Sequence, residues 1–134
     1  MSTPQTPMQQ LIESLQERAK ELNCLYLVDE ILSDPDRPLQ EVCDELVAAI
    51  PSGWQYPDAC CARLSIKNVR CEIPGCATTS WSLTAPVVVD GEQIGMLSVC
   101  YKSEQAAADE GPFLKEERKL INTIAERIGF FVTR

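Results

Sequence analysis

The stretch from Asp109 to Phe131 is a long amphipathic segment at the C-terminal end of the chain. Its apolar residues recur at steps of three and four, which is the spacing of one helix face. Asp109 and Glu110 place negative charge where a helix N-terminus favours it, Gly111 is an acceptable cap, and Pro112 fits the first helical position. The pattern predicts a helix that needs a sheet or another helix against its apolar stripe. That stripe consists of Leu114, Leu120, Ile121, Ile124, Ile128 and Phe131.

Two more helices are predicted in the first half of the chain. Over residues 8–32 the apolar positions keep a mixed three-four spacing that is close to a heptad repeat, and the prolines of the SDPDRP segment end it. A second helix is expected from about 38 to 50, with Asp36 as a candidate cap and Pro38 in its first turn. Residues 1–7 contain two prolines and small polar side chains, so we expect a disordered lead-in.

Residues 56–102 have the composition of β-structure. Strands are expected in 56–66, 69–73, 81–89 and 92–102, and Asp90-Gly91 is a strong hairpin signal between the last two. Strand alternation separates the first strand into two faces. One face carries Cys60, Ala62, Leu64 and Ile66, and the other carries Cys61, Arg63 and Ser65.

The element order is two helices, four strands and a helix. This order favours an α+β fold in which helices cover one face of an antiparallel sheet, and residues 1–134 read as a single domain.

Composition narrows the classes of partner. The net charge is −8 without any block of Lys or Arg, so nucleic acid and anionic membrane surfaces are disfavoured partners. No apolar run approaches the roughly 20 residues that span a bilayer. The first residues lack the features of a secretory signal, so a cytoplasmic location is expected. Seven cysteines, an odd number, then favour reduced thiols, and the absence of histidine excludes Ser-His-Asp and Cys-His catalysis within this chain.

Four segments carry a resemblance to a known family. They are RAKELNCLY (Arg18–Tyr26), IPSGWQYPDACCARL (Ile50–Leu64), VDGEQIGMLSVCYKSE (Val89–Glu104) and the terminal GPFLKEERKLINTIAERIG. Together they span roughly residues 15 to 132, and the chain resembles the GAF domains of bacterial and archaeal sensor proteins, including histidine kinases.

The resemblance implies a GAF-like (profilin-like) antiparallel sheet with the N- and C-terminal helices packed together on one face. It also implies a non-catalytic regulatory role, a small-molecule ligand on the opposite face of the sheet, and pairing of the terminal helices with those of a second subunit. In such proteins the helices join output domains, so we expect a separate output protein. GAF domains share a scaffold and differ in what they bind, so neither the ligand nor a cofactor follows from the resemblance.

The candidate ligand-binding residues are aromatic residues, arginines and cysteines near the middle strands. Aromatic rings supply apolar walls, and an arginine in a cleft can hold a carboxylate or phosphate by two hydrogen bonds. A mid-strand arginine such as Arg63 is either a pocket residue or a solvated surface residue. The expected cleft lies between the sheet and the loop around Gly75–Trp81. The candidates are Tyr56, Cys61, Arg63, Arg70, Cys76 and Trp81.

The cysteines offer an alternative function, a redox or metal sensor. Thiolates of Cys60, Cys61, Cys71 and Cys76 could bind zinc or an iron–sulfur cluster, and Cys71 with Cys76 could form a redox pair. Adjacent strand residues point to opposite faces, however, so Cys60 and Cys61 could not both ligate without a bulge. Buried thiols that simply pack as small apolar side chains are the simpler interpretation.

Activities known from other GAF domains lack their motifs here. Some members reduce free methionine sulfoxide with cysteines in Gly-rich and acidic motifs that this sequence does not contain. The residues of the cyclic-nucleotide-binding members are also missing, and the Cys-His pair of the bilin-binding members cannot exist without histidine. We therefore expect no enzymatic activity.

The two long amphipathic segments have more apolar positions than contact with a sheet needs. Broad stripes of this kind favour a second contact with another helix, and a homodimer is the economical explanation. The residues expected at that interface are Leu11, Leu15, Leu22, Ile121, Ile124 and Ile128.

Overall fold

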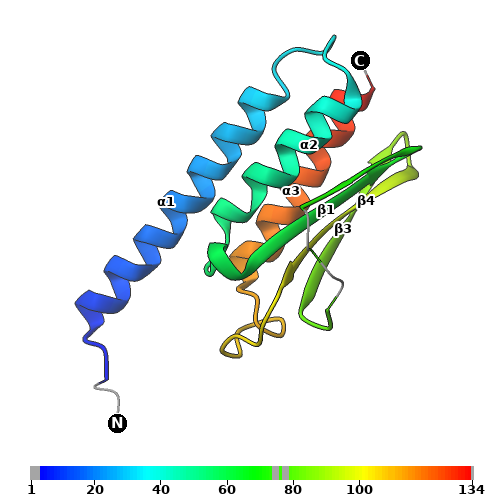
Figure 1. Ribbon diagram of the computed structural model, residues 1–134. Coiled ribbons are helices and arrows are strands. Elements are labelled where there is room, and N and C mark those ends of the chain that lie inside the picture. Colours follow the sequence, from blue (N-terminus) through cyan, green and yellow to red (C-terminus); the bar gives the residue numbers. More distant parts are fainter. Residues whose placement is uncertain (1–3, 74–75, 77–78, 134) are drawn as a thin grey trace.

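A computed structural model describes residues 4–73, 76 and 79–133 of the chain. Those residues form an antiparallel four-stranded sheet with the order β2-β1-β4-β3, together with three α-helices (Figure 1). The elements are α1 (Pro7–Ile31), α2 (Leu39–Ala49), the 3-10 turns η1 (Ile50–Gly53) and η2 (Pro57–Ala59), β1 (Cys60–Ile66), β2 (Val69–Glu72), β3 (Ser82–Val89), β4 (Glu92–Tyr101) and α3 (Lys115–Val132).

All three helices lie on the same side of the sheet, in two layers (Figure 1). The first layer is α2 against β1 and β2 and α3 against β3, and the second layer is α1, which packs on α2, α3 and η1. The predicted α+β class and antiparallel sheet are confirmed. The layering differs from the expectation, because α2 rather than α1 shares the sheet with α3. The reason is visible in burial: α1 buries only Cys24 and Val28, whereas α2 buries four residues.

The strands have the two faces that alternation predicts. In β1 the side chains of Cys60, Ala62, Leu64 and Ile66 join the main core beneath the helices. In β3 buried and exposed positions alternate, and Leu83, Ala85 and Val87 face the helices. Pro86 of β3 pairs with Met96 of β4, and β3 is an edge strand, where the missing N–H of proline is tolerated. Within the part of the chain that the structure describes, no helix covers the second face of the sheet.

Helix α1 begins with a capping box. The Gln9 backbone N–H donates to Thr6 Oγ1 at 3.1 Å, and the Thr6 backbone N–H donates to Gln9 Oε1 at 2.9 Å. Pro7 stands at the first helical position, so the predicted lead-in of residues 1–7 is too long; residues 1–3 lie outside the described part. The N-terminal half of α1 extends beyond the rest of the molecule (Figure 1).

The other two helix starts also differ from the prediction. Helix α2 has Pro38 as its N-cap, and the backbone N–H of Asp36 instead bonds the Asp34 carboxylate at 2.9 Å. Helix α3 begins at Lys115, later than predicted from Gly111 and Pro112. The preceding segment folds back on itself because the Ala108 N–H bonds the Gly111 carbonyl at 2.7 Å, with Gly111 at a φ of +56°. This turn places Phe113 in the core.

The first turn of α3 carries a buried carboxylate. Glu117 is 0% exposed and accepts hydrogen bonds from the backbone N–H groups of Leu114 at 2.7 Å and Gln55 at 2.8 Å. Burial raises the pKa of Glu117, and the two backbone donors oppose that rise. The side chain therefore joins the start of α3 to the segment that follows η1.

None of the helices in the described residues combines the length and apolarity that crossing a bilayer would require.

Candidate functional site

A hollow of about 600 Å³ lies at the β2 side of the sheet. Most of its lining residues belong to the uncovered face, but Leu64 and Cys71, which face the helices, and Asp44 of α2 line it as well. Ligand pockets in proteins generally fall between about 300 and 1,000 Å³, so a small molecule would fit. The hollow lies over β1, β2 and β4 and reaches α2 at Asp44. Its lining is Asp44, Arg63, Leu64, Ser65, Arg70, Cys71, Glu72, Met96 and Ser98.

Arg63 lies in the hollow and forms a cross-strand ion pair. It stands opposite Glu72 in the β1–β2 register, and its Nε atom is 2.6 Å from Glu72 Oε2. The Arg63 side chain is 34% exposed and that of Glu72 is 51% exposed, so solvent weakens the attraction and the pair contributes at most about 1 kcal/mol.

Arg70 is the second cation of the hollow. It stands opposite Ser65 in the register and is exposed. Within residues 4–73, 76 and 79–133 its guanidinium makes no ion pair, whereas Arg63 is already engaged with Glu72. Arg70 is therefore the cation best placed to hold an incoming anion, with the Ser65 and Ser98 hydroxyls lining the same hollow.

Four of the six predicted binding residues do not line the hollow, and two of these, Tyr56 and Trp81, pack against the main core. Tyr56 packs edge-on against Tyr101, with ring centroids 5.6 Å apart, on the helix side of the sheet. Trp81 packs against the same main core, and its backbone N–H bonds Thr79 Oγ1 at 3.2 Å. Neither lines the hollow, because core contacts hold both rings. The expected cleft beside Gly75–Trp81 involves residues 74, 75, 77 and 78, which lie outside the described part.

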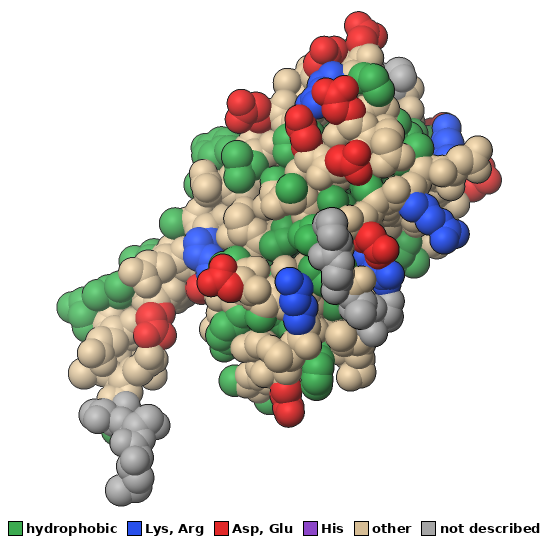
Figure 2. All heavy atoms as spheres, viewed as in Figure 1, with side chains coloured by type: hydrophobic (Ala, Val, Ile, Leu, Met, Phe, Trp, Pro, Cys, Tyr) green, Lys and Arg blue, Asp and Glu red, His purple; other side chains and the backbone are tan. Residues whose placement is uncertain are grey.

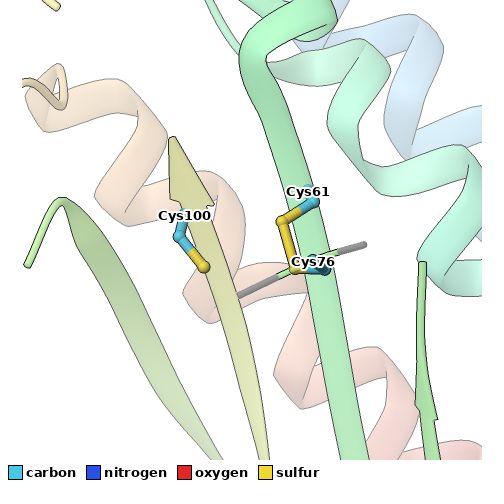
Figure 3. A group of neighbouring side chains, drawn as sticks. All are labelled: Cys61, Cys76 and Cys100. Carbon is cyan, nitrogen blue, oxygen red and sulfur yellow. A yellow bond between two sulfur atoms is a disulfide. The ribbon is translucent and has the colours of Figure 1, made fainter. Parts of the chain in front are cut away.

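Next to the hollow, on the same face, Cys61 and Cys76 form a disulfide (Figure 3). Their Cα atoms are 6.0 Å apart, and 15 positions separate them in the sequence. Cys100 of β4 stands directly opposite Cys61 of β1, and the three sulfur atoms lie within 4.8 Å of one another. All three residues are buried, in a small cluster separate from the main core.

The four cysteines proposed as metal ligands do not converge. Cys61 and Cys76 share the uncovered side of the sheet, whereas Cys60 and Cys71 belong to the core beneath the helices. The alternation of β1 is the cause, since consecutive side chains point to opposite faces. The proposed Cys71–Cys76 redox pair is also wrong, because Cys76 forms its disulfide with Cys61.

Three of the other buried thiols, those of Cys24, Cys60 and Cys71, are chemically protected. Burial raises the pKa of Cys24 to about 11 and raises that of Cys60 as well. A hydrogen bond with Cys43, followed by burial, raises the pKa of Cys71. A protonated thiol is a poor nucleophile and a poor metal ligand, so these residues act as core side chains at neutral pH.

Comparison of the chain with protein-family models, with curated proteins and with solved structures finds no match in any of the three.

In the structure, half of the residues expected at the dimer interface are buried within the chain and the other half are exposed. Ile121, Ile124 and Ile128 are fully buried in the chain's own core, since the stripe of α3 faces the sheet, and they are unavailable to a second subunit. By contrast, Leu11, Leu15 and Leu22 of α1 are between 53% and 59% exposed. Figure 2 shows apolar side chains along the outer edge of α1.

Cys100 is the site residue that sequence reasoning missed. Alternation along β4 puts it on the same strand face as Met96 and Ser98, but its proximity to Cys61 depends on β1 and β4 being neighbours. The paired residues of these strands are far apart in the sequence, as Cys61 and Cys100 are, so their proximity follows from the sheet order rather than from any local pattern. A search for cysteines on the outward faces of all predicted strands would have found the pair Cys61 and Cys100.

Proposed function

We propose that this chain is a non-catalytic sensor domain of the GAF type that binds a small anionic molecule on the uncovered face of its sheet. The observation that carries the proposal is the asymmetry of the sheet. All three helices lie on one side, and the other side presents a 600 Å³ hollow in which Arg70 is exposed. A carboxylate or phosphate group would pair with Arg70 and accept hydrogen bonds from the serine hydroxyls.

Binding could reach the helices through a short packing path. The hollow includes Asp44 of α2, and Gln40 of α2 donates from Nε2 to the Arg70 carbonyl at 3.5 Å. Helix α2 in turn packs on α1. A ligand that draws β2 inward would therefore shift α2 and change the position of α1. The mechanism is allosteric once two positions of α1 are observed with and without ligand.

Helix α1 supplies the output surface of this proposal. Its positions Met8, Ile12, Leu15, Ala19, Leu22 and Tyr26 follow alternating steps of four and three, which is the spacing of a coiled-coil seam, and all six are exposed. A second copy of the chain would cover this seam with an identical one, forming a helical homodimer. Signal transfer to a separate output protein would then depend on the pose of the paired helices.

The ligand proposal is tested by NMR titration with a panel of small mono- and dicarboxylates and phosphate monoesters. A member that binds should move the backbone signals of Ser65, Arg70 and Ser98. Arg70→Gln should weaken that binding at least tenfold, whereas Lys119→Gln on the exposed surface of α3 removes the same charge and should leave it unchanged. Equal losses in both variants would indicate non-specific attraction, and the absence of any response across the panel would refute the proposal.

A second candidate function is redox sensing, and the disulfide favours it. The Cys61–Cys76 bond ties the loop after β2 to β1 beside the hollow, so opening it would free the edge of the candidate site. Mass spectrometry of alkylated protein, taken across a series of thiol–disulfide buffers, should give a reversible two-electron transition confined to Cys61 and Cys76. A bond that stays closed in the folded protein in every buffer would contradict this function.

A further inference from the structure

Three sulfur atoms meet on the uncovered side of the sheet, each from a different segment. Cys61 comes from β1, Cys100 from the neighbouring strand β4, and Cys76 from the loop that follows β2 (Figure 3). The three sulfurs lie within 4.8 Å of one another, and all three residues are buried. In the described residues no carboxylate joins this group, and the chain has no histidine, so the donor set is sulfur alone.

This geometry is close to that of a metal-binding thiolate set. Zinc–sulfur bonds are about 2.3 Å long, so two thiolates in a tetrahedral zinc site lie about 3.8 Å apart. Cys61 and Cys100 are fixed by directly paired strands, whereas Cys76 lies on a loop. Opening the disulfide would free the Cys76 sulfur to move away from that of Cys61, and both of these sulfurs already lie within 4.8 Å of the Cys100 sulfur.

We propose that reduction of the Cys61–Cys76 disulfide creates a site for one thiophilic divalent cation of the zinc class, bound by the thiolates of Cys61, Cys76 and Cys100. Three protein ligands leave a fourth position for water or an external ligand, as in zinc sites that are not purely structural. An all-sulfur set selects soft and borderline ions over magnesium and calcium. The inference rests on the redox candidate function above, because the site exists only when the disulfide is open.

An external dithiol transfers two electrons and two protons to the Cys61–Cys76 bond and becomes a cyclic disulfide, leaving three thiols in the cluster. Binding of Zn²⁺ then displaces three protons and gives a site with a net charge of −1. Hydrogen peroxide would reverse the process: it takes two electrons from Cys61 and Cys76, closes the disulfide and becomes two molecules of water. Three protons are taken up, one of them by Cys100, and the ion is released.

The metal would replace the disulfide as the link between Cys76 and the sheet. Three buried thiolates without a cation would be unstable, so the ion is needed to keep the reduced cluster ionised. It would also hold the Cys76 loop against both β1 and β4, two positions along each strand from Arg63 and Ser98 of the hollow. The redox state and the availability of the metal would thereby both determine whether Cys76 is held beside the ligand site.

The experiment uses the full chain, reduced anaerobically with a phosphine, desalted and titrated with Co²⁺ and Zn²⁺. Co²⁺ reports thiolate ligation through sulfur-to-cobalt charge-transfer absorption and tetrahedral geometry through its d–d bands, and Zn²⁺ affinity is measured against a chromophoric chelator. We expect one ion per chain in the reduced protein, none in the oxidised protein, and an affinity that rises with pH as protons are displaced.

Two kinds of variant separate this site from other cysteines. Cys100→Ser retains both disulfide cysteines, so disulfide formation on oxidation checks its folding, and it should lower the affinity at least tenfold. Cys60→Ala and Cys71→Ala remove thiols on the helix side of the sheet and should leave both stoichiometry and affinity unchanged. Equal binding by Cys100→Ser and the parent protein would overturn the inference.

The number of free thiols after reduction distinguishes failure of the redox function from failure of the metal site alone. If the folded protein keeps five free thiols under reduction, the disulfide does not open, and the redox candidate and the metal site both fail. If all seven cysteines become free and the reduced protein binds neither Co²⁺ nor Zn²⁺ at one ion per chain, only the metal inference fails.

Discussion

The carboxylate of Glu117 accepts a hydrogen bond from the backbone N–H of Gln55 at 2.8 Å, across 62 positions of the sequence. A second backbone donor, the Leu114 N–H, bonds its other oxygen at 2.7 Å. The Glu117 side chain thus connects the first turn of α3 to the segment between η1 and η2. Its complete burial makes it the clearest pH-sensitive group of the core.

Ionisation of Glu117 should reduce stability as the pH rises. Burial raises the pKa of this carboxyl above its ordinary value of 4.5, so the folded chain binds the proton more tightly than the unfolded chain does. The contribution of the bound proton is complete below pH 4.5 and is lost as the pH rises through the raised pKa of the folded state. Glu117→Gln does not titrate, so its stability relative to the parent protein should increase with pH.

Urea unfolding from pH 4 to pH 8 measures this difference. The matched control is Glu126→Gln, which removes one carboxylate from the exposed face of the same helix. A stability difference between Glu117→Gln and the parent that is flat over this range, or that falls with pH, would contradict the assignment.

Gly95 should be intolerant of any side chain. A Cβ atom at this position would lie 2.1 Å from the Ser65 carbonyl oxygen, and that oxygen belongs to the paired strand β1, which cannot move aside without breaking the sheet. We expect Gly95→Ala to destabilise the fold by about 3 kcal/mol or more. Gln93→Ala, at an exposed site of the same strand, should stay within about 0.5 kcal/mol. Chemical denaturation followed by tryptophan fluorescence would compare the two, and similar midpoints would count against the close approach.

The local patterns of the sequence predicted the sheet well, because the alternation of apolar and polar residues can be recognised within a single strand. In β1 the residues Ala62, Leu64 and Ile66 alternate with Arg63 and Ser65, so the register of faces could be read without knowing any partner strand. The hollow could be anticipated to this extent, since the face with Arg63 had to point away from the core.

Non-local features could not be read in the same way. Cys61 and Cys100 meet only because β4 lies between β1 and β3, and no short segment encodes that order. Tyr56 and Trp81 have the composition of pocket walls, yet contacts with Tyr101 and the main core determine where they lie. The start of α3 was placed too early because the turn at Gly111 lies in a segment whose charges also suit a helix N-terminus.

Cys24 should be unreactive in the folded protein. Burial raises the pKa of this thiol to about 11, so at pH 7.5 nearly all of it is protonated, and the thiolate that attacks alkylating reagents is scarce. We expect iodoacetamide to label Cys24 at least a hundred times more slowly in native protein than in guanidinium-unfolded protein. Peptide mass spectrometry of timed samples measures both rates. Similar rates in the two states would show that the helix interface around Cys24 opens readily.

The seam on α1 should control assembly. A helix of 25 residues that buries only Cys24 and Val28 leaves its apolar positions in water, and exposure of Leu15 at 59% is typical of a surface awaiting a partner. Each leucine covered in a paired seam contributes roughly 1.5–3 kcal/mol, so a few such residues from each copy would hold a dimer together at micromolar concentration. Leu15→Glu places like charges opposite each other at the centre of the seam.

Sedimentation equilibrium would measure the effect. The parent chain should be a dimer, and Leu15→Glu should weaken association by at least a hundredfold, with a loss of helix content at the α1 N-terminus because the projecting turns lose their support. Gln16→Glu adds the same charge one position away from the seam and should remain dimeric. A monomeric parent chain at high micromolar concentration, or equal weakening by both substitutions, would rule out pairing through this face and leave the fold and the hollow unaffected.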